Sequence, residues 1–416
     1  MGRSGDNGAV PDGWRMVRLG DLVTLSQGGT PRKNEPAYWG GHVPFVTGAD
    51  LTDFRVSRDH ARSFLTPKGL RSGTTVVCKP GDLLLATRTR VGLAGIATDV
   101  MGASQDITRL VANGRVRSDY LCRALMKTAH SLQKMSRGTT IQGITRGDVE
   151  ALPILLPPLP EQRAIAAVLD GIDEAIERTD AVIAATERLR DSLLHDLLTR
   201  GVPGWHTEWK EAPGIGTIPT DWAVVRLGDV CSPPQYGAAA AARDHDPSLP
   251  RYVRITDLTD DGHLRPDDAR SAAPREVTGF ELLPGDLLFA RSGATVGKTY
   301  MYQAEDGPCV FAGYLIRFQS HREQADPRFL SLWTHSLAYW KWVASMFRAG
   351  AQPNINAAEY ASMPIPRPPL HEQRTIAETL RALDKSIEAG KRQCELLAAS
   401  KTSAADALLT GQVRLP

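Results

Sequence analysis

The chain has 416 residues, of which 42% are hydrophobic and 23% are charged, a composition that supports two or three packed domains and excludes global disorder. The formal net charge of +2 hides an uneven distribution: residues 1–150 carry 21 Lys and Arg against 13 Asp and Glu, whereas residues 201–365 carry 15 against 19. The basic first segment suits a polyanionic partner, while the acidic segment would need a local basic cluster for such a partner.

The five cysteines form no C-x-x-C pair, so they signal neither a zinc site nor a disulfide framework and fit a reducing compartment. The first residues, MGRSGDNGAVPDGW, lack the apolar segment of a signal peptide. No apolar run reaches the roughly 18 residues of a membrane span. We therefore expect a soluble, cytoplasmic protein.

The chain contains one pattern written twice, at an offset of 204 to 211 residues. The matching pairs, in chain order, are WRMVRLGDLV (14–23) with WAVVRLGDV (222–230), FVTGADLTD (45–53) with YVRITDLTD (252–260), PGDLLLA (80–86) with PGDLLFA (284–290), and PPLPEQRAIAAVLDGID (157–173) with PPLHEQRTIAETLRALD (368–384). Four matches in the same order make chance a poor explanation.

Each copy begins with short β-rich runs punctuated by Gly and Pro, and a helical stretch follows them. The pattern predicts strands at 43–46, 75–78, 83–86, 252–255, 287–290 and 310–318, and helices near 118–134 and 327–347. This order indicates mixed α+β domains. The aromatic side chains of the second helical stretch are expected to pack in a core: Trp333, Tyr339, Trp340 and Trp342.

Each copy ends in a Pro-rich hinge and a long amphipathic helix, which Gly201 and Gly411 are expected to terminate. Apolar residues recur at alternating steps of four and three, a seam typical of a coiled coil. We expect the two helices to pair with each other, the alternative being that each packs on its own domain. The pairing residues would be Ile165, Leu169, Ile172, Ile176, Ile183, Ile376, Leu380, Leu383, Ile387 and Leu397. The predicted segments are 1–156, 157–201, 202–365 and 366–416.

The repeated motifs, together with QGGTPRKNEPAYWGG (27–41) and RSGATVGK (291–298), resemble those of the specificity subunits of type I restriction–modification systems. The resemblance covers nearly the whole chain, and the doubled PPL-x-EQR helix is its most specific part. It implies an α+β fold in which two tandem α/β target-recognition domains are separated by two long antiparallel helices that form a coiled coil with pseudo-twofold symmetry.

The resemblance also implies a function without catalytic residues. Each domain would read one half of a bipartite, asymmetric site in double-stranded DNA. The helices would set the spacing and dock two methyltransferase subunits, and through these the restriction subunits. S-adenosylmethionine, ATP and Mg are then expected only in the partner subunits.

Candidate DNA contacts combine basic, hydroxyl, amide and glycine residues in loops that follow strands or precede the hinges. Such groups suit phosphate contacts, and Arg, Asn and Gln can read base edges. The alternative is an ordinary solvated turn or surface charge. The candidates are Gly28, Gly29, Thr30, Arg32, Lys33, Thr87, Arg88, Thr89, Arg90, Arg137, Thr139 and Gln142 in the first copy, and Tyr236, Arg243, Arg254, Arg291, Ser292, Lys298, Arg348, Gln352 and Asn354 in the second.

Two segments resemble enzyme motifs but depart from them at residues that the chemistry requires. SGATVGKT (292–299) has Ser in place of the first Gly of a nucleotide-binding P-loop, and a strand rather than a helix is expected after it. SPPQY (232–236) is similar to the [DNS]-P-P-[YF] tetrapeptide of amino-methyltransferases, but Gln235 interrupts the motif. No G-x-G loop for S-adenosylmethionine accompanies it. Two other functions stay open: a self-contained DNA modification enzyme, and a coiled-coil assembly adaptor without direct DNA reading.

Overall fold

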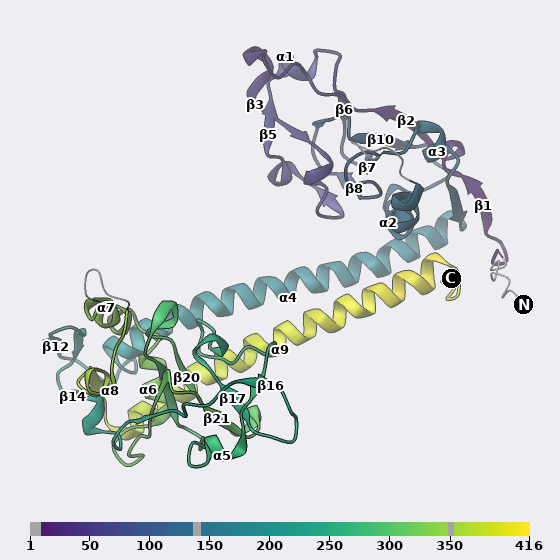
Figure 1. Ribbon diagram of the computed structural model, residues 1–416. Helices are drawn as coiled ribbons and strands as arrows, with labels where there is room; N and C mark the ends of the chain where they lie inside the picture. The colour runs from purple at the N-terminus through teal and green to yellow at the C-terminus, as the bar shows by residue number, and fades with distance from the viewer. Residues whose placement is uncertain (1–9, 136–142, 348–352) are drawn as a thin grey trace, which may run out of the picture. The chain divides into compact units, whose positions relative to one another are not determined.

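The computed structural model describes residues 10–135, 143–347 and 353–416. The chain divides into two compact units: unit 1 comprises Met1–Thr179 and Arg392–Pro416, and unit 2 comprises Asp180–Lys391. Two long helices, α4 (Leu159–Arg200) and α9 (Leu370–Leu409), each begin in one unit and end in the other (Figure 1). Each unit therefore consists of one globular domain and a part of both helices.

Unit 1 is built on two small sheets. The five-stranded sheet has the order β2 (Val23–Gln27), β10 (Ile107–Ala112), β7 (Leu83–Ala86), β8 (Ala94–Ala97) and β4 (Arg55–Val56). The four-stranded sheet has the order β5 (Ser63–Leu65), β3 (Trp39–Val46), β9 (Met101–Ala103) and β6 (Val76–Cys78). A separate pair joins β1 (Arg15–Arg18) to β11 (Pro153–Leu156), and the domain's helices are α1 (Pro67–Leu70), α2 (Ser118–Met135) and α3 (Arg146–Glu150).

Unit 2 has a four-stranded sheet in the order β15 (Gln235–Tyr236), β22 (Leu315–Phe318), β19 (Leu287–Ala290) and β20 (Thr299–Met301). Four two-stranded pairs surround it: β12 (Trp209–Ala212) with β13 (Gly216–Pro219), β14 (Ala223–Arg226) with β23 (Pro364–Arg367), β16 (Arg243–Asp244) with β18 (Arg270–Ser271), and β17 (Arg251–Val253) with β21 (Cys309–Phe311). Its helices are α5 (Pro274–Val277), α6 (Pro327–Trp333), α7 (Leu337–Ser345) and α8 (Ala357–Ala361).

The twin PGDLL strands explain why each domain has more than one core. All four residues of β7 are buried, and so are all four of β19. Because side chains alternate across a strand, Leu83 and Leu85 enter one core of unit 1 while Leu84 and Ala86 enter another. β19 does the same in unit 2. A short apolar run without polar alternation thus becomes a central strand covered on both faces.

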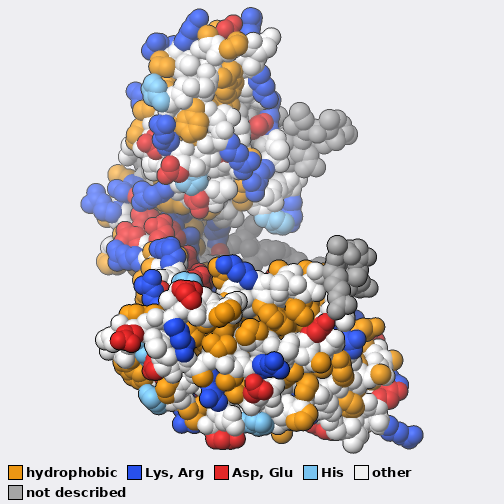
Figure 2. Space-filling view, turned by 90° about the vertical axis from the view of Figure 1, so that its left-hand side faces the viewer, with side chains coloured by type: hydrophobic (Ala, Val, Ile, Leu, Met, Phe, Trp, Pro, Cys, Tyr) orange, Lys and Arg blue, Asp and Glu red, His pale blue; other side chains and the backbone are white. Residues whose placement is uncertain are grey.

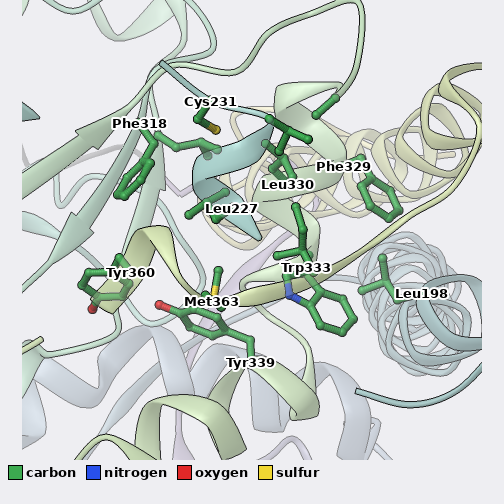
Figure 3. Close-up of a cluster of buried hydrophobic side chains, with 14 of the residues drawn as sticks. Leu198, Leu227, Cys231, Phe318, Phe329, Leu330, Trp333, Tyr339, Tyr360 and Met363 are labelled. Carbon is green, nitrogen blue, oxygen red and sulfur yellow. The ribbon is translucent and has the colours of Figure 1, made fainter. Parts of the chain in front are cut away.

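The main core of unit 2 gathers aromatic and aliphatic side chains from the sheet, α6, α7 and α8 (Figure 3). Phe318, Trp333, Tyr339 and Tyr360 are each at most 2% exposed. The expected core role is therefore confirmed for Trp333 and Tyr339, whereas Trp340 is 38% exposed and only partly packed.

The structure confirms the α+β class and the strands at 83–86 and 287–290, and it corrects three predicted elements. The strand expected at 252–255 ends at Val253, because Asp257 accepts the Arg254 amide N–H and closes a tight turn. The run 310–318 is two strands, β21 and β22, separated by a turn. The helix expected at 327–347 is interrupted, because the Ser336 side chain accepts the Tyr339 N–H and starts α7 anew.

The long helices pack antiparallel within each unit. In unit 1, Ile165 and Leu169 near the start of α4 share a core with Leu408 and Leu409 at the end of α9. The Lys401 ammonium lies 2.5 Å from a carboxylate oxygen of Asp173. Both helices end at a glycine with positive φ, Gly201 at 75° and Gly411 at 71°, as expected.

In unit 2 the end of α4 packs against the start of α9. Leu194, Leu197 and Leu198 near the end of α4 share a core with Ile376 and Leu380 near the start of α9. Ion pairs flank this seam, the Arg190 Nε to Asp384 Oδ1 distance being 2.8 Å and the Lys391 Nζ to Glu187 Oε1 distance 2.9 Å.

The remaining residues of the predicted seam are less uniformly covered. Ile183 and Ile387 are buried, and Ile172, Ile176, Leu383 and Leu397 are half-buried.

Gly390 explains why the apolar seam of α9 is interrupted near its middle. A Cβ atom at this position would lie 2.8 Å from Cγ1 of Ile183, which is closer than packed side chains allow. The glycine therefore admits the Ile183 side chain between the helices.

We predict that Gly390→Leu lowers the free energy of unfolding by about 1–3 kcal/mol, because the new side chain overpacks the seam. Gly171 is the matched control: it also lies in a long helix, but a Cβ there would meet nothing within 4 Å. Gly171→Leu should leave stability unchanged or raise it by up to about 1 kcal/mol, since leucine is the better helix former. Urea denaturation of both variants measures this, and equal stabilities would contradict the prediction.

Candidate nucleic-acid interface

A buried hydrogen bond joins the two ends of each repeat. In unit 1 the Trp14 indole N–H donates to the Glu161 carboxylate at 2.8 Å, and in unit 2 the Trp222 indole donates to Glu372 at 3.0 Å. All four side chains are at most 5% exposed. The tryptophan opens the W-x-x-V-R-L-G-D motif and the glutamate belongs to PPL-x-EQR, so the two repeated motifs form one contact.

The glutamine of the same motif fastens the globular domain to its helix. Gln162 accepts the Arg117 N–H at 2.8 Å and donates to the carbonyls of Pro157 and Arg115. Gln373 accepts the Asp326 N–H at 2.9 Å and donates to the carbonyls of Pro368 and Gln324 at 2.8 and 3.1 Å. A buried amide that satisfies three backbone groups fixes where each domain meets its hinge.

Each buried glutamate also receives a group from just beyond the end of the other helix. Glu161 accepts hydrogen bonds from Arg414, which follows α9, at 2.7 and 3.0 Å. This arginine, with Trp14, lowers the pKa of Glu161, while the carboxylate raises the pKa of Arg414. Glu372 instead receives His206 Nε2, which follows α4, at 2.7 Å. The geometry repeats while the residue that contacts the glutamate differs.

With the domains anchored in this way, three strand ends of unit 1 (27–30, 87–90 and 104–106) meet Gly143 at one border, and we call these four segments edge 1. Backbone hydrogen bonds bring them together, from Gly28 to Ile107 at 2.9 Å, from Thr87 to Asp106 at 2.8 Å and from Ile144 to Thr87 at 2.9 Å. Two of the candidate loops, 28–30 and 87–90, are therefore neighbours.

The candidates in edge 1 have different environments. Arg88, Thr89 and Arg90 are exposed, and Thr89 has a φ of 62°. Thr87 is buried and its hydroxyl lies 3.1 Å from that of Thr108. Thr30 donates to the Gln105 side chain. Arg32 and Lys33 lie beyond this network and are exposed.

Close backbone packing accounts for the two glycines of edge 1. A Cβ at Gly28 would lie 2.0 Å from the Ser104 carbonyl oxygen, and one at Gly29 would lie 2.0 Å from that of Thr74. This close approach gives both glycines a packing role, and their predicted contact with DNA stays a prediction.

The corresponding border of unit 2, edge 2, contains Tyr236, Arg291, Ser292, Tyr314 and Asn354. The Arg291 N–H donates to the Tyr314 carbonyl at 3.0 Å, and Ser292 pairs with Asn354 in an antiparallel bridge. The Arg291 guanidinium lies over the Tyr236 ring, 4.9 Å from its centroid. Four segments far apart in the sequence thus meet at edge 2, where Tyr236, Arg291 and Asn354 bring aromatic, basic and amide groups together.

The other candidates of unit 2 are tied to neighbouring carboxylates or lie elsewhere. Arg254 donates to Asp257 and Asp268, which raises its pKa and occupies its donors. Lys298 Nζ lies 2.8 Å from Asp260. Arg243 is exposed on β16. Arg137, Thr139, Gln142, Arg348 and Gln352 lie outside the described residues.

Sequence reasoning missed Tyr314, which is 62% exposed in the turn between β21 and β22. The signal was the Gly313–Tyr314 pair, which interrupts the apolar run 310–318 that the pattern predicts to be one strand. Gln105 and Asp106 of edge 1 were missed for another reason: they lie in the turn between β9 and β10, and the pattern predicted neither of these strands. Figure 2 shows Lys and Arg side chains spread over the visible face of unit 1, in keeping with the basic balance of residues 1–150.

A family model described as the type I restriction modification DNA specificity domain matches the chain twice, over residues 11–187 and 219–397. The chain belongs to this family. The two matches cover most of the sequence and coincide with its internal repeat, so the resemblance drawn from the motifs is confirmed.

The chain is similar over nearly its whole length to curated and solved members of the family. The type I restriction enzyme MjaVIII specificity subunit of Methanocaldococcus jannaschii is 24% identical, with 98% of this chain and 94% of that protein covered. The S subunit of a type I restriction-modification system from M. genitalium has a TM-score of 0.58 at 16% identity, over 95% of this chain and 96% of the other.

A third relative is a chain from a solved type I restriction-modification system, described in the context of complex assembly and conformational transition. It has a TM-score of 0.58 at 21% identity and covers 98% of this chain and 100% of its own length. These two structural likenesses show that the fold is that of the family's S subunits. Within the part of the chain that the structure describes, no helix is both long and apolar enough to cross a membrane.

We predict that Trp14→Phe and Trp222→Phe each lower the free energy of unfolding by about 1–3 kcal/mol, because each removes a donor from a buried carboxylate. Trp209→Phe is the control, since Trp209 is 45% exposed and its loss should change stability by less than about 0.5 kcal/mol. Chemical denaturation compares the three variants. If all three variants unfold at the same denaturant concentration, the hydrogen bond from the indole to the buried carboxylate does not stabilise the fold.

Proposed function

We propose that this chain is the DNA-reading subunit of a type I restriction–modification complex, in which each unit reads one half of a bipartite, asymmetric site. The observation that carries the proposal is a family domain that occurs twice on one scaffold and ends in two different edges. A single chain with two unlike readers can recognise unlike half-sites, whereas a homodimer would impose a palindrome.

Support for a shared scaffold comes from the strand register. Arg109 on β10 lies 2.6 Å from Asp82, and Arg317 on β22 lies 3.2 Å from Asp286, in the same places of the two sheets. The aspartates belong to the PGDLL motifs, so each ion pair holds the loop before a central strand. The two domains therefore present their edges from the same framework.

Support for different readers comes from the edges themselves. The register aligns Gln27 with Tyr236, Thr87 with Arg291 and Asp106 with Tyr314. Gln27 and Thr87 both contact the Thr108 hydroxyl in a network of amides and hydroxyls, whereas Arg291 lies over the ring of Tyr236. Because base edges are distinguished by donors and acceptors, unlike side chains imply unlike half-sites.

The long helices would set the distance between the half-sites. At about 1.5 Å per residue, the 42 residues of α4 and the 40 of α9 span about 63 and 60 Å. A stiff connection of that order can hold two readers on one side of B-DNA, where binding positions recur about every 34 Å. It would do so without an ordering cost at each binding event.

The chemistry is assigned to partner subunits in this proposal. Two methyltransferase subunits would dock on the helices, with S-adenosylmethionine in their own sites, and restriction subunits with ATP and Mg would join through them. The chain itself would bind DNA in the cytoplasm without a catalytic residue. Family membership and the two failed enzyme motifs support this division of labour.

Selection from a random duplex pool tests the proposal. The purified chain with its methyltransferase partner should enrich a split motif with a fixed gap. Its affinity should fall steeply between two salt concentrations, because phosphate contacts release counterions. Enrichment of an unsplit motif, or of none, would rule the proposal out. An affinity that does not depend on salt would do so as well.

The spacing role makes a separate prediction. Inserting one helical heptad after Ala184 in α4 and another after Ala389 in α9 keeps the seams in register, because Ile183 and Gly390 face each other. Each helix grows by about 10.5 Å, so the gap between half-sites should widen by about three base pairs while both half-sites stay the same. A heptad in α4 alone is the control and should abolish binding. Altered half-sites with an unchanged gap would refute the spacing role.

A further inference from the structure

One side chain in edge 2 is both free to bind and fixed in place. Within the part of unit 2 that the structure describes, the terminal nitrogens of Arg291 have no carboxylate or carbonyl partner. Several other arginines of this unit are committed: Arg254 to Asp257, Arg317 to Asp286 and Arg328 to Asp326. Arg275 is exposed, and among the described residues of unit 2 none pairs with its guanidinium or holds it in place.

Two neighbours hold the Arg291 guanidinium. The guanidinium carbon lies over the Tyr236 ring, 4.9 Å from the centroid, and Nε lies 3.5 Å from Oδ1 of Asn354. The Tyr236 ring is fixed in turn, because its hydroxyl accepts the Ala357 N–H at 3.0 Å. The cation–π contact with the ring and the contact at Nε restrain the fork while leaving its two terminal nitrogens open.

The backbone of Arg291 is fixed as well. Its N–H donates to the Tyr314 carbonyl at 3.0 Å, and its carbonyl accepts the Ile355 N–H at 2.9 Å. The residue comes directly after β19, whose four residues are all buried. A long flexible side chain thus starts from a rigid position, which lowers the ordering cost of binding.

We propose that edge 2 is a guanine-reading site, in which the terminal nitrogens of Arg291 donate two hydrogen bonds to O6 and N7 of one guanine in the major groove. The inference rests on the proposed function and names its chemistry in one half-site. Arg291 is the reading residue, and Tyr236 and Asn354 are positioning residues. An oriented planar fork matches the paired acceptors of guanine and of no other base in that groove.

Unit 1 cannot present the same reader. Thr87 takes the place of Arg291, is 3% exposed and contacts the Thr108 hydroxyl, and Gln27 takes the place of Tyr236. The effect of changing Arg291 should therefore be confined to one half-site.

The test is the recognised motif of the complex with its methyltransferase partner, read from methylated sites and from duplex selection. In Arg291→Ala, one G·C position of one half-site should become degenerate, with preference for guanine reduced on the order of ten- to a hundredfold. The other half-site should not change. Arg275→Ala, which removes an equal charge from the same unit, should leave the whole motif intact.

Two further variants separate reading from folding. Arg291→Lys keeps the charge but not the fork, so it should lose the guanine preference and keep the salt-dependent affinity. Tyr236→Leu should relax the same single position, and Tyr236→Phe should relax it less, because the ring stays while its bond to the Ala357 N–H is lost.

The inference is wrong if Arg291→Ala and Arg291→Lys recognise the wild-type motif, or if the wild-type motif has no G·C pair in the half-site of unit 2. A wild-type complex that selects no split motif would instead remove the proposed function. A wild-type split motif that survives both substitutions removes only the guanine site.

Discussion

At the start of each long helix, a buried glutamate accepts a hydrogen bond from a tryptophan that lies 147 residues earlier in unit 1 and 150 residues earlier in unit 2. A carboxylate removed from water is tolerated only with strong partners, so the chain must return to the helix at this point. The return places β1 against β11 and β14 against β23, next to the hinge. The domain boundaries, the hinge and the orientation of each sheet relative to its helix depend on this contact.

The two units share their backbone geometry and apolar packing more closely than their charged side chains. Glu161 pairs with Arg414, and Glu372 pairs with His206. In unit 1 Arg123 donates to Asp170 and Asp173 on α4, whereas α9 has Arg381 at the position equivalent to Asp170. Buried apolar seams and satisfied backbone groups leave little choice of side chain, whereas a buried carboxylate can be satisfied by more than one kind of polar partner. This difference explains how one scaffold can carry a basic domain and an acidic one.

The sequence was sufficient for elements whose pattern is local. The run Leu83–Ala86, the helix from Ser118 and the glycines that end α4 and α9 were all predictable from apolar periodicity and turn chemistry. The bond from Trp14 to Glu161 was not, since nothing local in either motif indicates its distant partner. The two edges were predicted only in part: Arg88 and Arg291 were found as basic residues after a strand, while Tyr314 was hidden in an apolar run that contains a turn.

The edges show how constant and variable roles can coexist on adjacent residues. A Cβ at Gly28 would lie 2.0 Å from the Ser104 carbonyl oxygen, and a Cβ at the equivalent Gly237 would lie 2.2 Å from that of Ala312. Both glycines are therefore required by the backbone approach that forms the edge. The residue before each glycine is under no such constraint, and it is Gln27 in one unit and Tyr236 in the other. Because the glycine fixes the backbone on its own, the neighbouring side chain can change the chemistry of the edge without moving the strands that support it.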